Sequence, residues 1–140
     1  MYHVAFRYPE RATLADAYRR AIADLEAEEY REEWAALQHS LGWMYWECMG
    51  GERAENLERA IAHYQRALEV RTRQAFPERW AMTQNNLGSA YSDRIRGERA
   101  ENLERAIGHY TRALEVRTRE AFPSDWAGTQ NSAGNADWNR

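Results

Sequence analysis

The sequence predicts an all-α protein in which three antiparallel helix pairs stack as an α-solenoid. The segment Gly51–Ile61 returns letter for letter as Gly97–Ile107, an offset of 46 residues. Across 51–91 and 97–137, 31 of 41 positions are identical, and a fixed period in this range is typical of stacked repeats. Three units of 46 would fill 138 of the 140 positions, and about three repeats are needed to bury a continuous core.

The N-terminal part of the chain is predicted to hold an extended arm and then a helix. Residues 1–10 lack helical periodicity and contain Pro9, so we expect an arm. Thr13 to Asp16 has the spacing of a capping box, with Asp in place of Glu. The helix that follows is expected to run to about Glu29. Its apolar face has residues at i, i+3 and i+4 spacing: Leu14, Ala17, Tyr18, Ala21, Ile22 and Leu25.

Five further helices follow from the same periodicity. A helix from near Glu32 is expected to end at Gly50 and Gly51, because glycine commonly follows a helix end. The next helix, about 54–74 and including Arg71, should be broken by Phe76 and Pro77, since helix is disfavoured before proline. The last three helices are expected at about 78–95, 100–120 and 124–138. The connections are short, which favours antiparallel neighbours, so we expect one repeat domain over 11–140 with units at about 11–50, 51–96 and 97–140.

Charge, hydropathy and cysteine content narrow the class of function. The net charge is −3, without the basic surplus typical of nucleic-acid-binding domains. No apolar run approaches the roughly 20 residues that a membrane-spanning helix needs. Cys48 is the one cysteine, so no internal disulfide can form and a reducing compartment, the cytoplasm, is expected. We therefore expect neither nucleic acid nor membrane as a partner, and no cofactor.

Small and large residues alternate in a pattern that resembles a known repeat family. Leu87-Gly88-x-x-Tyr91, followed by Ala106-x-x-x-Tyr110-x-x-Ala113-Leu114, resembles the tetratricopeptide repeat signature, whose usual unit is about 34 residues. The longer unit is similar to the repeats of kinesin light chain, in which a helix like 66–71 leads through a proline-containing turn to a segment like 85–87. It also resembles bacterial repeats often fused to caspase-like domains. The resemblance implies a right-handed helical stack and a non-catalytic module that binds a protein or peptide in its concave groove.

The resemblance also implies which residues line that groove. In this family the first helix of each pair faces the groove, through the positions three before, one after and four after the glycine. Transferred to this sequence, these positions are His39, Trp43, Trp46, Asn85, Ser89, Ser92, Asn131, Asn135 and Trp138. Asn can both donate to and accept from a peptide backbone, and Trp is a common binding anchor. Alternatively, Trp43 and Trp46 pack under the N-terminal arm or in a dimer contact.

Several other repeated residues are expected to have a role in packing or to face solvent rather than to form a binding site. Gly42 and Gly88 should let two helices approach closely, and the recurring Trp34, Trp80 and Trp126 should be core residues. His63 and His109 recur on a polar face, and a metal site would need more ligands at close spacing, so solvated positions are expected.

The last helix leaves a second function open. Leu87 and Tyr91 are replaced at the equivalent positions by Ala133 and Asp137. Terminal repeats need a polar outer face, so this helix is expected to cap the stack. The alternative is that its outer side pairs with a second chain, which would make the protein a self-assembling structural unit.

Overall fold

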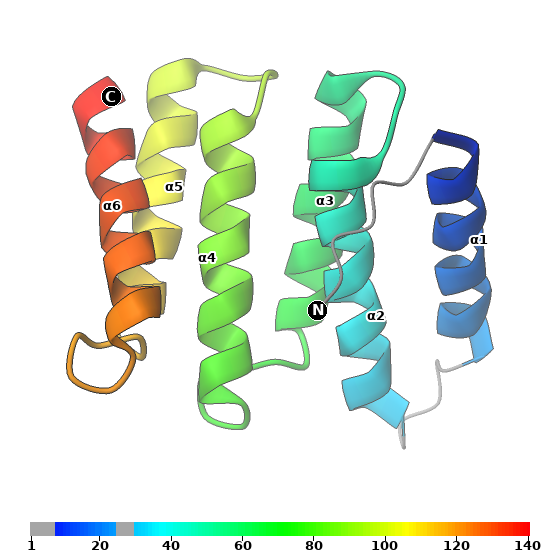
Figure 1. Ribbon diagram of the computed structural model, residues 1–140, viewed down its shortest axis with the longest axis horizontal. Helices are drawn as coiled ribbons and strands as arrows, with labels where there is room; N and C mark the ends of the chain where they lie inside the picture. The colour runs from blue at the N-terminus through cyan, green and yellow to red at the C-terminus, as the bar shows by residue number, and fades with distance from the viewer. Residues whose placement is uncertain (1–7, 25–29) are drawn as a thin grey trace. The chain divides into compact units, whose positions relative to one another are not determined.

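The computed structural model describes residues 8–24 and 30–140, and every regular element in these ranges is a helix (Figure 1). The prediction of an all-α protein is therefore confirmed. The elements are α1 (Tyr8–Asp24), α2 (Arg31–Trp43), the π-helical η2 (Met44–Cys48), α3 (Arg53–Leu68), α4 (Pro77–Asp93), α5 (Arg99–Leu114) and α6 (Pro123–Asn139).

The chain forms two compact units, residues 1–70 and 71–140. The first contains α1, α2, η2 and α3, and the second contains α4, α5 and α6. Each unit has one hairpin of a repeated kind: α2 and η2 pack against α3 in the first, and α4 packs against α5 in the second, where α5 also packs against α6. The bounds of α3 and α5 differ by the 46-residue repeat offset, so the two hairpins are structural equivalents.

The first helix begins earlier than the sequence predicted. It starts at Tyr8, inside the stretch that we expected to be an extended arm. Pro9 is its second residue, and the first turn of a helix tolerates proline because its N–H groups lack intrahelical partners. Thr13 consequently lies inside the helix, so the predicted capping box is wrong. Asp16 instead accepts a hydrogen bond from Arg19 at 2.5 Å.

The third and fifth helices end earlier than predicted. They stop at Leu68 and Leu114, about six residues before the predicted ends. Pro77 does not break a helix; it begins α4, where its fixed φ suits the first helical position. Arg71, expected on the third helix, lies in the intervening turn and is buried. The longer repeat unit therefore contains a structured turn rather than extra helix.

The repeated spacing of glycine and tyrosine in the two hairpins reflects one packing arrangement. A Cβ atom added at Gly42 would lie 2.7 Å from the ring of Tyr64, and one added at Gly88 would lie 2.8 Å from the ring of Tyr110. Both tyrosine side chains are buried. We expected the glycines to bring helix backbones together; instead each glycine makes room for the ring of a tyrosine from the partner helix.

Two buried asparagines, which the sequence pattern does not single out, hold the loop within each hairpin. Asn56 donates from Nδ2 to the carbonyl oxygen of Gly50 at 3.1 Å. Asn102 donates to the carbonyl oxygen of Arg96 at 2.8 Å and accepts from Arg94 at 3.2 Å. The loops also contain glycine with positive φ, as at Gly97 (φ 83°). Each asparagine thus gives a loop carbonyl group its buried hydrogen-bond partner. This bond fixes the conformation of a loop in which glycine has wide backbone freedom.

The substitution Asn102→Ala is expected to lower the free energy of unfolding by about 2 kcal/mol, because it removes buried hydrogen bonds and leaves their partners unsatisfied. Chemical denaturation measures the change. Asn131→Ala is the matched control, since Asn131 is exposed and surface substitutions usually stay within about 0.5 kcal/mol. Equal stabilities of the two variants would contradict the assigned role of Asn102.

The recurring tryptophans are only partly enclosed. Trp34, Trp80 and Trp126 are all half-buried, so the expectation that they are core residues is met only in part. The guanidinium carbons of Arg73 and Arg119 lie 5.7 Å from the Trp80 ring centre and 5.6 Å from the Trp126 ring centre. Arginine–indole contacts of this kind are favourable at partly exposed sites and explain how the remaining ring surface is covered.

Candidate functional site

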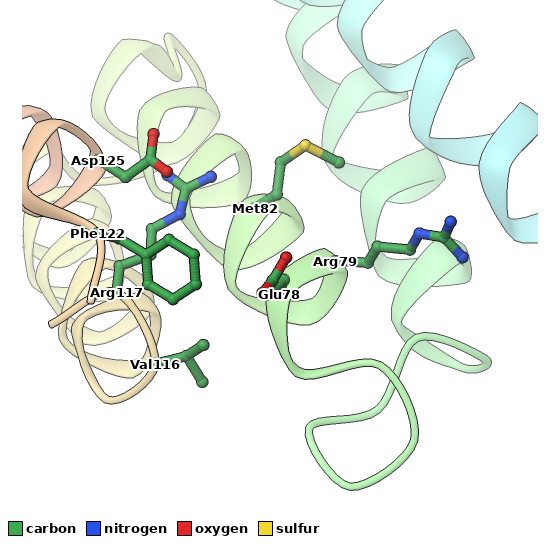
Figure 2. Close-up of a pocket in the computed structure, with 7 residues that line it drawn as sticks. All are labelled: Glu78, Arg79, Met82, Val116, Arg117, Phe122 and Asp125. Carbon is green, nitrogen blue, oxygen red and sulfur yellow. The ribbon is translucent and has the colours of Figure 1, made fainter.

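In the second unit, α4 and α6 each pack against α5 but hardly touch each other. Two hollows lie along the line between α4 and α6. The first, of about 200 Å³, lies where both helices begin (Figure 2) and is lined by Glu78, Arg79, Met82, Val116, Arg117, Phe122 and Asp125.

The first hollow has an apolar interior with charged residues around it. Met82 comes from α4, whereas Val116 and Phe122 come from the segment that joins α5 to α6. Figure 2 shows the Phe122 ring and the Val116 side chain projecting from that segment toward α4. Burial of an apolar side chain here would be favourable by about 25 cal/mol per Å² of apolar surface removed from water.

The second hollow, of about 210 Å³, lies near the carboxyl ends of α4 and α6 and is mostly polar. Its lining residues are Ser92, Asp93, Arg99, Leu103, Tyr110, Ser132, Asn135, Ala136 and Asn139. Ser92 and Asn135 were among the groove residues implied by the family resemblance. The structure brings these two side chains, from different helices, to one site.

Between the hollows, hydrogen bonds connect the three helices. The hydroxyl of Thr129 on α6 donates to Oδ1 of Asn85 on α4 at 2.8 Å. Ser89 on α4 and Tyr110 on α5 are joined at 3.0 Å between their hydroxyl oxygens. Asn131 is exposed and lines neither hollow. The structure therefore places Asn85, Ser89, Ser92 and Asn135, but not Asn131, along the line between α4 and α6; we call this line, with its two hollows, the α4–α6 groove.

The dimensions of the α4–α6 groove suit an extended chain. From Glu78 to Asp93 the helix rises about 22 Å, the length of about six or seven residues in extended conformation. Each hollow is smaller than the roughly 300–1,000 Å³ of a typical small-molecule pocket. The groove therefore fits side chains spaced along a peptide better than a single compact ligand.

The remaining implied groove residues lie in the first unit. The ring of His39 packs against Tyr64 with 5.2 Å between ring centres. Trp43 is 41% exposed and Trp46 is half-buried. Trp46 lies in η2, whose π-helical turn is wider than an α-helical turn, so the regular i, i+4, i+7 spacing that placed Trp46 beside Trp43 does not hold there. At a buried position of this turn, Met44 stands where α4 has the smaller Ala90.

His63 and His109 are not simple solvated positions, as the sequence suggested, but part of the hairpin contact. Nδ1 of His63 lies 2.7 Å from Oε1 of Gln38, and His109 has the same contact with Gln84. The same Nδ1 atoms also lie 3.3 Å from Nη1 of Arg66 and of Arg112, respectively. The ring of His63 also stacks on that of Tyr45, with 5.5 Å between ring centres.

The environment keeps both histidines neutral. Burial, with a smaller contribution from Arg66, lowers the pKa of His63 from 6.5 to about 4. Burial and Arg112 likewise lower the pKa of His109 from 6.5 to about 4. Desolvation and neighbouring positive charge both disfavour the protonated ring, so the same electrostatic arrangement recurs in both hairpins.

Neither other classes of site nor known proteins give a further indication of function. Within residues 8–24 and 30–140, no three His, Cys, Asp or Glu side chains gather as a metal site would require. None of the helices in these ranges combines the length and apolar character needed to cross a membrane. No family model, no curated protein and no solved structure matches this chain.

Sequence reasoning missed the apolar hollow. Met82 and Phe122 were assigned only to a helix and to a turn, respectively, because the family resemblance considers three positions of the glycine-bearing helix and ignores the turn. A signal was present, since Phe recurs before proline in the turns at Phe76 and Phe122. A recurring large apolar residue in a turn indicates that the turn packs against something.

Proposed function

We propose that this chain is a non-catalytic protein–protein interaction module of the tetratricopeptide type, whose helix pairs stack as a right-handed solenoid. In this proposal the α4–α6 groove binds an extended peptide segment of a partner protein in the cytoplasm. The observation that carries the proposal is the polar second hollow, in which Ser92 and Asn135 come together from separate helices. The recurrence of one hairpin packing at Gly42 and Gly88 supports the stacked architecture.

The chemistry of the groove supports a peptide ligand. Hydroxyl and amide groups in the second hollow can donate to and accept from peptide backbone groups. The first hollow offers Met82, Val116 and Phe122 to one apolar side chain. We therefore expect a partner segment with an apolar residue near one end and a backbone-mediated contact about six residues away.

Selection from a random peptide library displayed on phage tests the proposal. Peptides that bind the 140-residue chain are synthesised, and their dissociation constants are measured by fluorescence anisotropy. Asn135→Ala is expected to weaken binding about 5- to 30-fold, as loss of one or two hydrogen bonds would. The matched control is Asn131→Ala on the same helix, which should leave affinity unchanged.

Two results would count against the α4–α6 groove as the peptide site: recovery of no peptide above background, or equal affinities for wild type, Asn135→Ala and a Met82→Arg variant that fills the first hollow. Selected peptides that respond to Trp43→Ala and Trp46→Ala, but not to Asn135→Ala, would place the site on α2 and η2 instead.

A second candidate function, self-assembly, is favoured by one observation. Trp138, at the end of α6, is 89% exposed, and large exposed aromatic side chains are enriched at protein interfaces.

A further inference from the structure

The six α-helices alternate between two kinds, defined by one repeated residue. The glycine helices α2, α4 and α6 carry Gly42, Gly88 and Gly134, and the tyrosine helices α1, α3 and α5 carry Tyr18, Tyr64 and Tyr110. In each hairpin a glycine helix is followed by its tyrosine helix, with the tyrosine ring over the glycine. Within the described residues, α1 is a tyrosine helix and α6 a glycine helix outside these two hairpins.

A second contact recurs in the two hairpins. Arg53 at the start of α3 donates to the backbone carbonyl oxygen of Trp46, and Arg99 at the start of α5 donates to that of Ser92. Each hairpin is thus held at its middle by tyrosine on glycine, and at one end by arginine on a carbonyl. In both hairpins, therefore, the helix that pairs with a glycine helix supplies a tyrosine ring and an arginine.

The glycine helix α6 has the site for such a partner with nothing seated in it. No described atom outside its own turn lies within 4 Å of a Cβ built at Gly134, whereas the equivalent positions at Gly42 and Gly88 lie within 3 Å of a tyrosine ring. Trp138, one helical turn further and therefore on the same face, is 89% exposed.

The first helix, α1, has the tyrosine that this site requires. Tyr18 occupies in the sequence the position of Tyr64 and Tyr110. Tyr64 and Tyr110 are buried, but Tyr18 is half-buried. α1 therefore matches α3 and α5 at the key residue while leaving part of that residue uncovered.

The helices α1 and α6 also differ from the hairpin helices at two positions that would face each other if α1 paired with α6. In the hairpins a histidine stacks on a tyrosine, as His109 does on Tyr91 with 5.4 Å between ring centres. On α1, Ala17 stands at the position of the histidine, and on α6, Asp137 stands at the position of the tyrosine. Both members of the stacked pair are absent together, and Ala17 is exposed. A pairing of α6 with α1 would place Asp137 opposite a small residue that leaves it space.

We propose that α6 of one copy of this chain and α1 of another copy form a third hairpin, in which the ring of Tyr18 covers Gly134. The contact joins different surfaces, so it is heterologous: after it forms, one copy still has a free α1 and the other a free α6. Repetition of this contact joins copies one after another in a head-to-tail series. This inference is independent of the peptide-binding proposal, because Gly134 and Ala17 line neither hollow of the α4–α6 groove.

Sedimentation velocity of the 140-residue chain, from about 1 μM to about 1 mM, tests the assembly across the range of weak association. The expected result is an average mass that rises with concentration beyond that of a dimer. Gly134→Leu fills the space over the glycine and should abolish the rise. Gly128→Leu is the matched control on the same helix, since a Cβ at Gly128 also meets nothing, and it should leave assembly unchanged.

Exposed Ala17 permits a test from the other side of the contact. Ala17→Glu puts a larger, charged side chain opposite Asp137, which is paired with Arg140 at 2.8 Å, and should block association, whereas Ala17→Ser adds little volume and no charge and should leave it unchanged. Both substitutions are on the solvent-exposed face of α1, and circular dichroism verifies that each variant is folded.

Mixing two blocked variants distinguishes head-to-tail contact from symmetric contact. Gly134→Leu and Ala17→Glu should each be monomeric alone, and a 1:1 mixture should form a dimer that does not grow, since each variant contributes one intact helix. If the helices α6 of two copies paired symmetrically, Ala17→Glu alone would dimerise and the mixture would add nothing. That result, or a monomer at every concentration of the wild type, would overturn the proposal.

Discussion

Replacement of Gly88 by alanine is expected to lower the free energy of unfolding by about 2 kcal/mol. The added Cβ would lie 2.8 Å from the ring of Tyr110, a buried side chain whose hydroxyl group is bonded to Ser89 at 3.0 Å. The ring cannot move away without breaking that contact, and overpacking of a filled core typically costs about 1–3 kcal/mol. Urea denaturation of wild type and variant measures the difference.

Gly128→Ala is the matched control, because a Cβ at Gly128 meets no atom within 4 Å. Alanine has the higher helix propensity, so this substitution should stabilise the protein by about 0.5–1 kcal/mol. The two Gly→Ala changes are thus expected to have opposite signs. Stabilisation by both would mean that Tyr110 does not lie over Gly88.

Stability is expected to fall as the pH is lowered from about 6.5 to about 4. The pKa of His63 and of His109 is lowered from 6.5 to about 4 in the folded protein, so the unfolded chain binds more protons in this window and acid favours unfolding. Part of each ring remains in solvent, so we expect a loss of about 1–2 kcal/mol per histidine after screening is allowed for. Above about pH 6.5 this contribution is constant.

The double variant His63→Asn/His109→Asn isolates the effect. Asparagine offers an amide N–H near the position of Nδ1 but does not titrate, so the variant should lose less stability than the wild type between pH 6.5 and pH 4. Chemical denaturation at several pH values gives the free energy of unfolding of each protein. The difference between the two values isolates the histidines, because the carboxylates contribute equally to both. Parallel pH profiles would show that folding does not lower the pKa of the two histidines.

The 46-residue repeat was sufficient to predict the helices and the equivalence of the two hairpins. Periodicity identifies which side chains share a face, so Leu57, Ala60, Tyr64 and Leu103 were correctly placed on the buried faces of α3 and α5. Helix ends were less accurate. The segments after Leu68 and Leu114 contain residues compatible with helix, but in the structure they form turns in which the hydroxyl groups of Thr72 and Thr118 accept hydrogen bonds from the backbone at 3.2 Å.

Polar contacts between helices were the least predictable part. Asn56 and Asn102 are ordinary polar residues of a first helical turn in the sequence, and their burial depends on loop carbonyl groups that lie six residues away. His63 becomes part of the hairpin contact only because Gln38, 25 residues distant, faces it. Single-sequence periodicity does not pair side chains across such distances, so it assigned the histidines to solvent.

The groove was predictable in part. The family resemblance implied Ser92 and Asn135 as groove residues, and both line one hollow. It gave equal weight to Asn131, which lines neither hollow, and could not detect the π-helical turn that contains Trp46. Counting from a glycine can place residues on one helix face only where the helix is regular.

The measurement that tests the central claim most directly is an NMR titration of the ¹⁵N-labelled chain with a library-selected peptide. Binding in the α4–α6 groove should shift the side-chain amide signals of Asn135 and Asn139 and the backbone signals near Met82 and Phe122, and should leave the side-chain signal of Asn131 in place. Shifts confined to residues outside the groove, or no shifts at saturating peptide, would contradict the proposed function.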